Sequence, residues 1–195
     1  MIQYWCAILL RTRAFLAFCF LMLTACEQDK GDLQVSTSDN ISAESVIIAL
    51  PVIPEGMKAD KILVDKSDRH LILFAGEEEI ARYENVRFGD TPDGHKQFEG
   101  DERTPEGEYI IEGRNPGSSY HLSLRISYPN ASDIAFAEQH GKSAGGDIFI
   151  HGQPNGYDGA AISRDWTDGC IALSNAEIKQ IWDVVPDGTK IIIQP

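Results

Sequence analysis

The sequence predicts one mainly β domain with a few helices, preceded by a leader and a tether. Three observations support this prediction. Most apolar residues after residue 59 fall in short runs bounded by turn-forming residues. One segment near the C-terminus combines helical spacing of apolar residues with a helix start signal. The domain would hold about 135 residues, which is enough for a single hydrophobic core.

The first strands follow one another closely. Lys61 to Asp65 and His70 to Phe74 are apolar runs separated by Lys66-Ser67-Asp68-Arg69, which predicts a β-hairpin. After the turn at Ala75-Gly76, the pattern predicts two further strands, Glu79 to Tyr83 and Asn85 to Phe88.

In the middle of the domain, the sequence predicts longer turns between strands. We expect strands at Glu108 to Glu112, Tyr120 to Ser127 and Asp147 to His151. Residues 89–107, 113–118 and 141–146 are rich in turn-forming residues and are expected to be loops.

One helix is clear from the sequence. Ser174 and Glu177 form a capping box, and four apolar residues mark one face at helical spacing: Ile178, Ile181, Trp182 and Val185. Pro186-Asp187-Gly188 ends the helix, and Lys190 to Gln194 predicts a final strand. We expect the few helices to pack at one side of the β structure.

The N-terminal segment predicts export. Arg11 and Arg13 precede Ala14 to Leu23, an uncharged apolar stretch too short to span a bilayer comfortably. We therefore assign residues 1–25 as a signal peptide. Residues 26–58 begin with a stretch rich in Ser, Asp, Gln and Gly, which predicts a tether. The folded domain is predicted at residues 59–195.

The end of the leader resembles a bacterial lipobox. Leu23-Thr24-Ala25 precedes Cys26, which in that motif is lipidated and becomes the first residue after cleavage. The resemblance implies a lipid anchor on Cys26, and Glu27 after it implies the outer membrane rather than the inner one. The alternative is an ordinary signal peptide with Cys26 unmodified.

The charge of the chain argues against polyanionic partners. The whole sequence has 17 basic and 30 acidic residues. The leader carries two arginines and no acids, so removing it leaves 15 basic and 30 acidic residues, a net charge of −15. We therefore expect no binding to nucleic acid, and an acidic substrate must be held by local contacts.

Cys170 is the candidate nucleophile. The other three cysteines, Cys6, Cys19 and Cys26, fall in or at the end of the leader, so the domain holds a single thiol. His151 ends an apolar strand and could stabilise the thiolate as its base. Alternatively, Cys170 is a small buried apolar residue and His151 a core histidine. An unpaired cysteine in an oxidising compartment favours the catalytic role.

The neighbours of this pair suit acyl transfer. Gly152 lets another backbone or a substrate approach closely, and Gly169 removes a side chain beside the thiol. Backbone N–H groups near Gly169 and Cys170 could form an oxyanion hole, to which Thr167 could add a hydroxyl.

These residues resemble the L,D-transpeptidases with the YkuD-type catalytic domain (the ErfK/YbiS/YcfS/YnhG group). The matching blocks appear in the same order as in the family: Arg103-Thr104-Pro105-Glu106-Gly107-Glu108-Tyr109, Ser127-Tyr128-Pro129-Asn130, Gly146 to Gly152, and Thr167-Asp168-Gly169-Cys170. The resemblance implies a YkuD-like, β-sandwich-type domain and a cysteine acyltransferase of peptidoglycan.

The resemblance also implies roles for the site residues. Cys170 would attack the third residue of a tetrapeptide stem, and His151 would act as base and acid. Gly152 would orient the imidazole, while Gly169 and Thr167 would belong to the oxyanion and binding loop. The acyl group would pass to an amine of another stem, of a lipoprotein or of a D-amino acid. No cofactor is implied.

Two positions depart from the family pattern. Many members have His where this chain has Asp168, and Arg or Asn where it has Ala172. An anion at position 168 disfavours the thiolate unless Arg164 or another cation offsets it. A cysteine peptidase or amidase that cleaves wall peptides, and a non-catalytic wall-binding lipoprotein, therefore stay open as alternatives.

A few further residues have two possible roles. Arg103 could face the substrate or the solvent, and Arg125, Tyr128 and Asp133 could line the cleft or serve as strand and turn residues. The remaining histidines show no spacing typical of metal ligands, and no metal is assigned.

Overall fold

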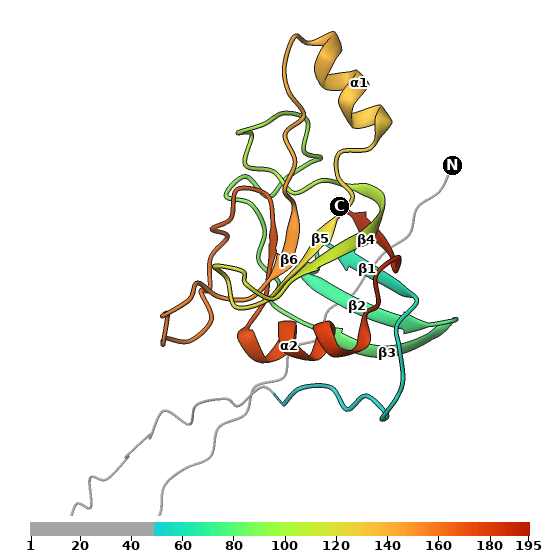
Figure 1. The fold of residues 1–195 in the computed structure, drawn as a ribbon. Helices are drawn as coiled ribbons and strands as arrows, with labels where there is room; N and C mark the ends of the chain where they lie inside the picture. The colour runs from blue at the N-terminus through green and yellow to red at the C-terminus, as the bar shows by residue number, and fades with distance from the viewer. Residues whose placement is uncertain (1–48) are drawn as a thin grey trace, which may run out of the picture. The chain divides into compact units, whose positions relative to one another are not determined.

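A computed structural model describes residues 49–195 of the chain (Figure 1). The predicted signal peptide, Cys26 and most of the predicted tether therefore lie outside the described residues. The described residues contain eight strands and two helices. The strands are β1 (Lys61–Asp65), β2 (His70–Ala75), β3 (Glu78–Tyr83), β4 (Gly107–Asn115), β5 (Ser123–Ile126), β6 (Phe149–His151), β7 (Ile171–Ala172) and β8 (Lys190–Gln194). The helices are α1 (Ala131–Gln139) and α2 (Asn175–Val184).

The strands form one curled mixed sheet in the order β3-β2-β1-β8-β4-β5-β6-β7. Neighbouring strands are antiparallel except for the β1–β8 and β6–β7 pairs, which are parallel. The last strand of the chain thus lies in the middle of the sheet, between β1 and β4. The prediction of a mainly β fold with a few helices is confirmed.

Alternating apolar side chains explain the regular part of the sheet. Ile62 and Val64 of β1 and Ile191 and Ile193 of β8 point into the core and are almost completely buried. Because strand side chains alternate between two faces, these four residues share the core face, while Leu63 and Ile192 fall on the opposite face and are only partly buried. Burial of these aliphatic side chains drives the assembly of the hairpin β1–β2 with β8.

Several strand predictions differ from the structure. Strand β6 begins at Phe149 rather than Asp147, and β7 was not predicted. Residues 85–88 form no strand, and only an isolated bridge joins Arg87 to Ala172. Strand β4 extends to Asn115, so it includes residues that the sequence places in a turn. Strand β5 begins at Ser123 rather than Tyr120, because the chain at His121 takes a left-handed conformation (φ 66°) that interrupts the extended backbone.

Helix α1 is absent from the sequence prediction. Its N-cap is Asn130, whose side chain accepts hydrogen bonds from the N–H groups of Ser132 and Asp133. Only Asp133 and Ala137 of this helix are buried, so it has no apolar stripe that a periodicity argument could detect. The capping box of Asn130 and Asp133 was the available signal.

Helix α2 forms as predicted. The Ser174 hydroxyl accepts from the N–H of Glu177, and the Glu177 carboxylate accepts from the N–H of Ser174. Ile178 and Ile181 are fully buried, and the helix contacts β5 and β6. The expectation that the helices pack at one side is wrong, since α1 and α2 lie at opposite ends in Figure 1.

Candidate active site

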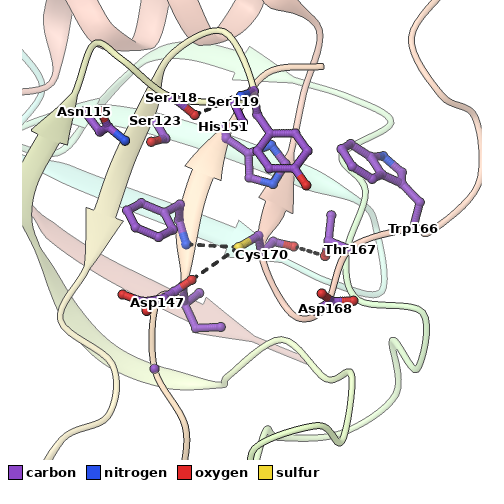
Figure 2. A pocket seen from close by; sticks show the side chains of 14 residues that line it. Asn115, Ser118, Ser119, Ser123, Asp147, His151, Trp166, Thr167, Asp168 and Cys170 are labelled. Atoms are coloured by element: carbon purple, nitrogen blue, oxygen red, sulfur yellow. Dashed lines mark hydrogen bonds between the residues drawn. The ribbon is translucent and has the colours of Figure 1, made fainter. Parts of the chain in front are cut away.

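Cys170 and His151 line the same cavity, which has a volume of about 600 Å³ (Figure 2). Its walls come from the end of β4, the segment before β5, the segment leading into β6, and the loop before β7. The sheet thus brings together the two residues that the sequence singles out as nucleophile and base.

His151 is held firmly at the end of β6. It pairs with Ser123 of β5 and Ala172 of β7, and its side chain is buried. The imidazole Nδ1 lies 2.7 Å from the carbonyl oxygen of Gly152. Because a carbonyl oxygen can only accept, Nδ1 carries the hydrogen in this contact. The other nitrogen, Nε2, is then unprotonated and able to accept a proton.

Aromatic rings flank the imidazole. The Tyr120 ring centroid lies 4.7 Å from that of His151, and the Trp166 ring meets the imidazole edge-on at 5.5 Å. This burial lowers the pKa of His151, while the hydrogen bond to Gly152 acts in the opposite direction. His151 is therefore neutral at pH 7 and prepared to act as a base.

Gly152 leaves room for packing by helix α2. A Cβ atom at this position would lie 2.5 Å from Oδ1 of Asn175 and 3.0 Å from Cγ2 of Ile178. It would also lie 3.1 Å from Cβ of His121. The sequence predicts that another backbone or a substrate approaches this glycine, whereas the atoms nearest to it in the described chain belong to side chains.

The Cys170 sulfur meets two backbone groups of the segment that leads into β6. Phe149 donates its N–H to Sγ at 3.4 Å, and the Asp147 carbonyl oxygen lies 3.6 Å from Sγ, where it can accept the thiol proton (Figure 2). Asp147 has a left-handed backbone (φ 54°), which is uncommon for a residue with a side chain. The resting thiol therefore has both a donor and an acceptor from the backbone.

The environment of Cys170 favours the neutral thiol. Burial raises its pKa to about 11, and the negative charges of Asp168 and Asp147 act in the same direction. The Phe149 N–H and the Lys96 ammonium lower the pKa in part. Because the pKa of His151 is lowered, the resting Cys170 thiol and the resting imidazole are both neutral.

The loop before Cys170 uses its own polar groups to hold its shape. The Thr167 hydroxyl donates to the Cys170 carbonyl at 2.7 Å and accepts from the Gly169 N–H at 3.2 Å. Gly169 has φ +125°, and a Cβ there would lie 2.5 Å from the Arg103 carbonyl oxygen. Of the groups considered for the oxyanion hole, the Cys170 N–H makes no hydrogen bond within residues 49–195.

The cation that acts on the thiol is Lys96 rather than Arg164. Lys96 is buried and bonds to Asp101 at 2.9 Å and to the Phe98 carbonyl at 3.1 Å. Arg164 is exposed and lies 4.0 Å from Asp90. Lys96 stands in a turn-rich loop with no motif around it, so no sequence pattern indicated its position near the thiol.

Of the other sequence candidates, Tyr128 and Asp133 are buried away from the cavity. Tyr128 donates its hydroxyl to the Ala144 carbonyl, and Asp133 caps α1. Arg125 lines a neighbouring cavity. The sequence did not single out several lining residues, among them Asn115, Tyr120 and Asp147, because they come from segments that only the sheet brings together.

The model of the YkuD-type L,D-transpeptidase catalytic domain matches residues 59–193. The chain belongs to this family. Among named L,D-transpeptidases, YafK of Escherichia coli K12 is 35% identical over 104 residues, covering 52% of this chain and 35% of YafK. YkuD of Bacillus licheniformis is 31% identical over 96 residues, covering 48% of this chain and 46% of that protein.

A solved structure shares the fold of this L,D-transpeptidase domain. It is the helical cell shape determining protein Pgp2 of Campylobacter jejuni, with a TM-score of 0.56 and 28% identity. The match covers 75% of this chain and 50% of Pgp2. The chain thus spans half or less of the length of these relatives. Within residues 49–195, neither helix has the length and apolar character needed to cross a bilayer.

Proposed function

We propose that this L,D-transpeptidase domain transfers peptidoglycan stem peptides, with Cys170 as the nucleophile and His151 as base and acid. One observation carries the proposal. Cys170 and His151 face one cavity, and the bond of Nδ1 to the Gly152 carbonyl leaves Nε2 able to take the thiol proton.

In the acylation step, the Cys170 thiol gives its proton to Nε2 of His151 as Sγ attacks the carbonyl carbon of the third stem residue. The C–S bond forms, and the carbonyl oxygen takes the negative charge. The Cys170 N–H is the donor available to this oxyanion, since the hydroxyl of Thr167 and the N–H of Gly169 hold the loop.

The tetrahedral intermediate then collapses. The C–N bond breaks, and the imidazolium of His151 gives its proton to the departing amine of the terminal residue. This leaves the acyl group on Cys170 as a thioester and His151 neutral, as its buried site favours.

In the transfer step, an acceptor amine attacks the thioester and His151 takes a proton from it. Sγ leaves and recovers a proton from the imidazolium, which restores the neutral pair. The acceptor would be an amine of a second stem, of a lipoprotein or of a D-amino acid. If water attacks instead, the same chemistry is hydrolysis.

The proposed place of this reaction is the periplasm. We infer a signal peptide at residues 1–25 and a lipid on Cys26, with residues 26–58 as the tether to the domain. The outer membrane is the proposed attachment site because Glu27 follows Cys26. A lipid with several acyl chains would hold the protein at the bilayer.

The test is incubation of the full chain with disaccharide tetrapeptide, followed by mass analysis of the products. Cross-linked dimers joined through third residues, or exchange of the terminal residue for an added D-amino acid, support transfer. Tripeptide as the sole product identifies a hydrolase. No product contradicts the proposal and favours a wall-binding role. The same products from Cys170→Ala contradict the role of Cys170 as nucleophile.

A further inference from the structure

We propose that Arg125 binds a carboxylate of the donor peptide beside the scissile bond and thereby selects which peptides this domain accepts. The inference rests on the proposed function in one respect: it takes the ligand to be a peptide that carries free carboxylates near the bond that Cys170 attacks.

Arg125 stands next to the catalytic cavity. It lies on β5 and pairs with Phe149 of β6, whose N–H contacts the Cys170 sulfur. Its side chain lines a second cavity of about 360 Å³, which shares Asn115 and Phe149 with the catalytic cavity. A peptide in the catalytic cavity would therefore reach Arg125 without leaving the surface of the sheet.

The present partners of Arg125 can be exchanged for a ligand. Its guanidinium lies 3.0 Å from Glu112 and 3.2 Å from Asp147, and all three side chains are accessible, at 48%, 39% and 80%. Ion pairs at this level of exposure contribute little to stability. The two carboxylates keep the guanidinium oriented toward the cavity, and an incoming carboxylate can replace either of them.

The other arginine of this cavity is committed elsewhere. Arg114 donates to the backbone carbonyls of Trp182 and Val185 at the end of α2, and to Asp187. Its guanidinium also stacks over the Trp182 ring, 5.0 Å from the centroid. Arg114 thus fixes the end of the helix, which leaves Arg125 as the exchangeable arginine of this cavity.

The charge of the chain favours such a residue. The net charge is −13, and Asp147 and Asp168 both line the catalytic cavity. A carboxylate that enters this cavity meets repulsion unless a cation compensates it. The planar guanidinium of Arg125 can bind a carboxylate through two parallel hydrogen bonds.

The contact with Asp147 places the bound carboxylate close to the nucleophile. The backbone carbonyl of Asp147 faces the Cys170 sulfur, while its side chain contacts Arg125. In Figure 2, Asp147 and Asn115 lie on one side of Cys170, and Thr167 and Trp166 lie on the other. The donor carboxylate would thus lie on the Asp147 side of the sulfur.

Two carboxylates of a tetrapeptide stem fit this position. One is the C-terminal carboxylate of the residue that leaves, and the other is the side-chain carboxylate of a diaminopimelate at the third position. Both are close to the scissile bond, and the same guanidinium chemistry would recognise either one.

The test measures binding to the full chain carrying Cys170→Ala, so that turnover plays no part. Three ligands are titrated by calorimetry: the free tetrapeptide, its C-terminal amide, and the peptide amidated on the third side chain. We expect one amide to bind at least about tenfold more weakly than the free acid, because it loses a charged hydrogen-bond partner. The amide that loses affinity identifies the carboxylate.

Adding Arg125→Gln should reduce that ratio to about one, and Arg125→Lys should retain part of it. Arg164→Gln is the matched control. Arg164 is an exposed arginine that lines neither cavity, and its acidic neighbour Asp90 lies 4.0 Å away. A ratio unchanged by Arg125→Gln, equal binding of all three ligands, or no binding overturns the inference. If the affinity ratio depends on Arg125 but the unmodified enzyme shows no turnover, only the proposed function is contradicted.

Discussion

The two ends of the sheet differ in regularity. At one end, β1 pairs with both β2 and β8 through five residue pairs each, and the pairs on the core face, such as Ile62 with Leu73 and with Ile191, are buried aliphatics. At the other end, β6 and β7 pair through only two residue pairs. The buried side chains there include His151 and Ser123.

This difference shows what irregular strands provide. In the regular end, backbone N–H and C=O groups are used in the sheet ladder. Around β6 and β7, several of these groups bond to side chains of the site: the Phe149 N–H and Asp147 carbonyl contact Cys170, and the Gly152 carbonyl contacts His151. The regular end supplies stability, and the irregular end supplies backbone groups for chemistry.

The first prediction separates these two contributions most strongly. Cys170→Ala should reduce acyl transfer by on the order of 10³-fold or more, because no other thiol lies in residues 49–195. The free energy of unfolding should change by less than about 1 kcal/mol, since only a half-buried thiol is removed. Turnover assays and denaturant unfolding measure the two effects. If Cys170→Ala lost its folded state together with its activity, the proposed division between a stabilising end and a chemical end of the sheet would be contradicted.

The second prediction concerns the pH dependence of the thiol. Because burial raises the pKa of Cys170 to about 11, the thiolate fraction at pH 7 is small and grows with pH. The rate of alkylation by iodoacetamide should therefore rise about tenfold per pH unit between pH 7 and 10. A rate that levels off below pH 8 would show a preformed thiolate and contradict the neutral resting pair.

The third prediction tests the regular end. Leu73→Ala removes a fully buried side chain of β2 and should lower the free energy of unfolding by about 2–5 kcal/mol. The activity per folded molecule should stay unchanged. Ile110→Ala on β4 is the control, because this isoleucine is 45% exposed and should lose less. An equal loss in both variants, measured by urea unfolding, would speak against the core assignment.

The fourth and smallest effect concerns the packing behind the base. Gly152→Ala should cost about 1–3 kcal/mol, because its Cβ would collide with Asn175 and Ile178 of α2. Any backbone shift would also move the carbonyl that holds His151, so kcat should fall as well. Gly113→Ala in β4 is the matched control, since nothing lies within 4 Å of its Cβ. Equal thermal stability and turnover of the two variants would argue against this packing role.

The regular end of the sheet is also the part that sequence reasoning predicted best. The hairpin β1–β2, strand β8 and helix α2 follow directly from alternating or helical apolar patterns. Helix α1 was not predicted. Its visible anchors are a capping box and the Asp133 carboxylate, which also accepts a hydrogen bond from the Tyr109 hydroxyl. No apolar stripe marked it.

For the site, the sequence identified the candidate nucleophile and base but little of their surroundings. The motif around Cys170 and the strand ending at His151 pointed to both residues. The contacts of Asp147 and Phe149 with the sulfur involve backbone atoms, which any residue type could supply. Lys96 acts from a loop that only the folded chain brings near the thiol.

Asp168 has a consequence for how this loop can change during evolution. Thr167, Gly169 and Cys170 are tied to one another or packed against Arg103, whereas the exposed Asp168 side chain makes no hydrogen bond within the described chain. Lineages could therefore exchange residue 168 without refolding the loop. An exchange of Asp168 for a neutral or basic residue would change the charge beside the sulfur and thereby the pKa of the thiol.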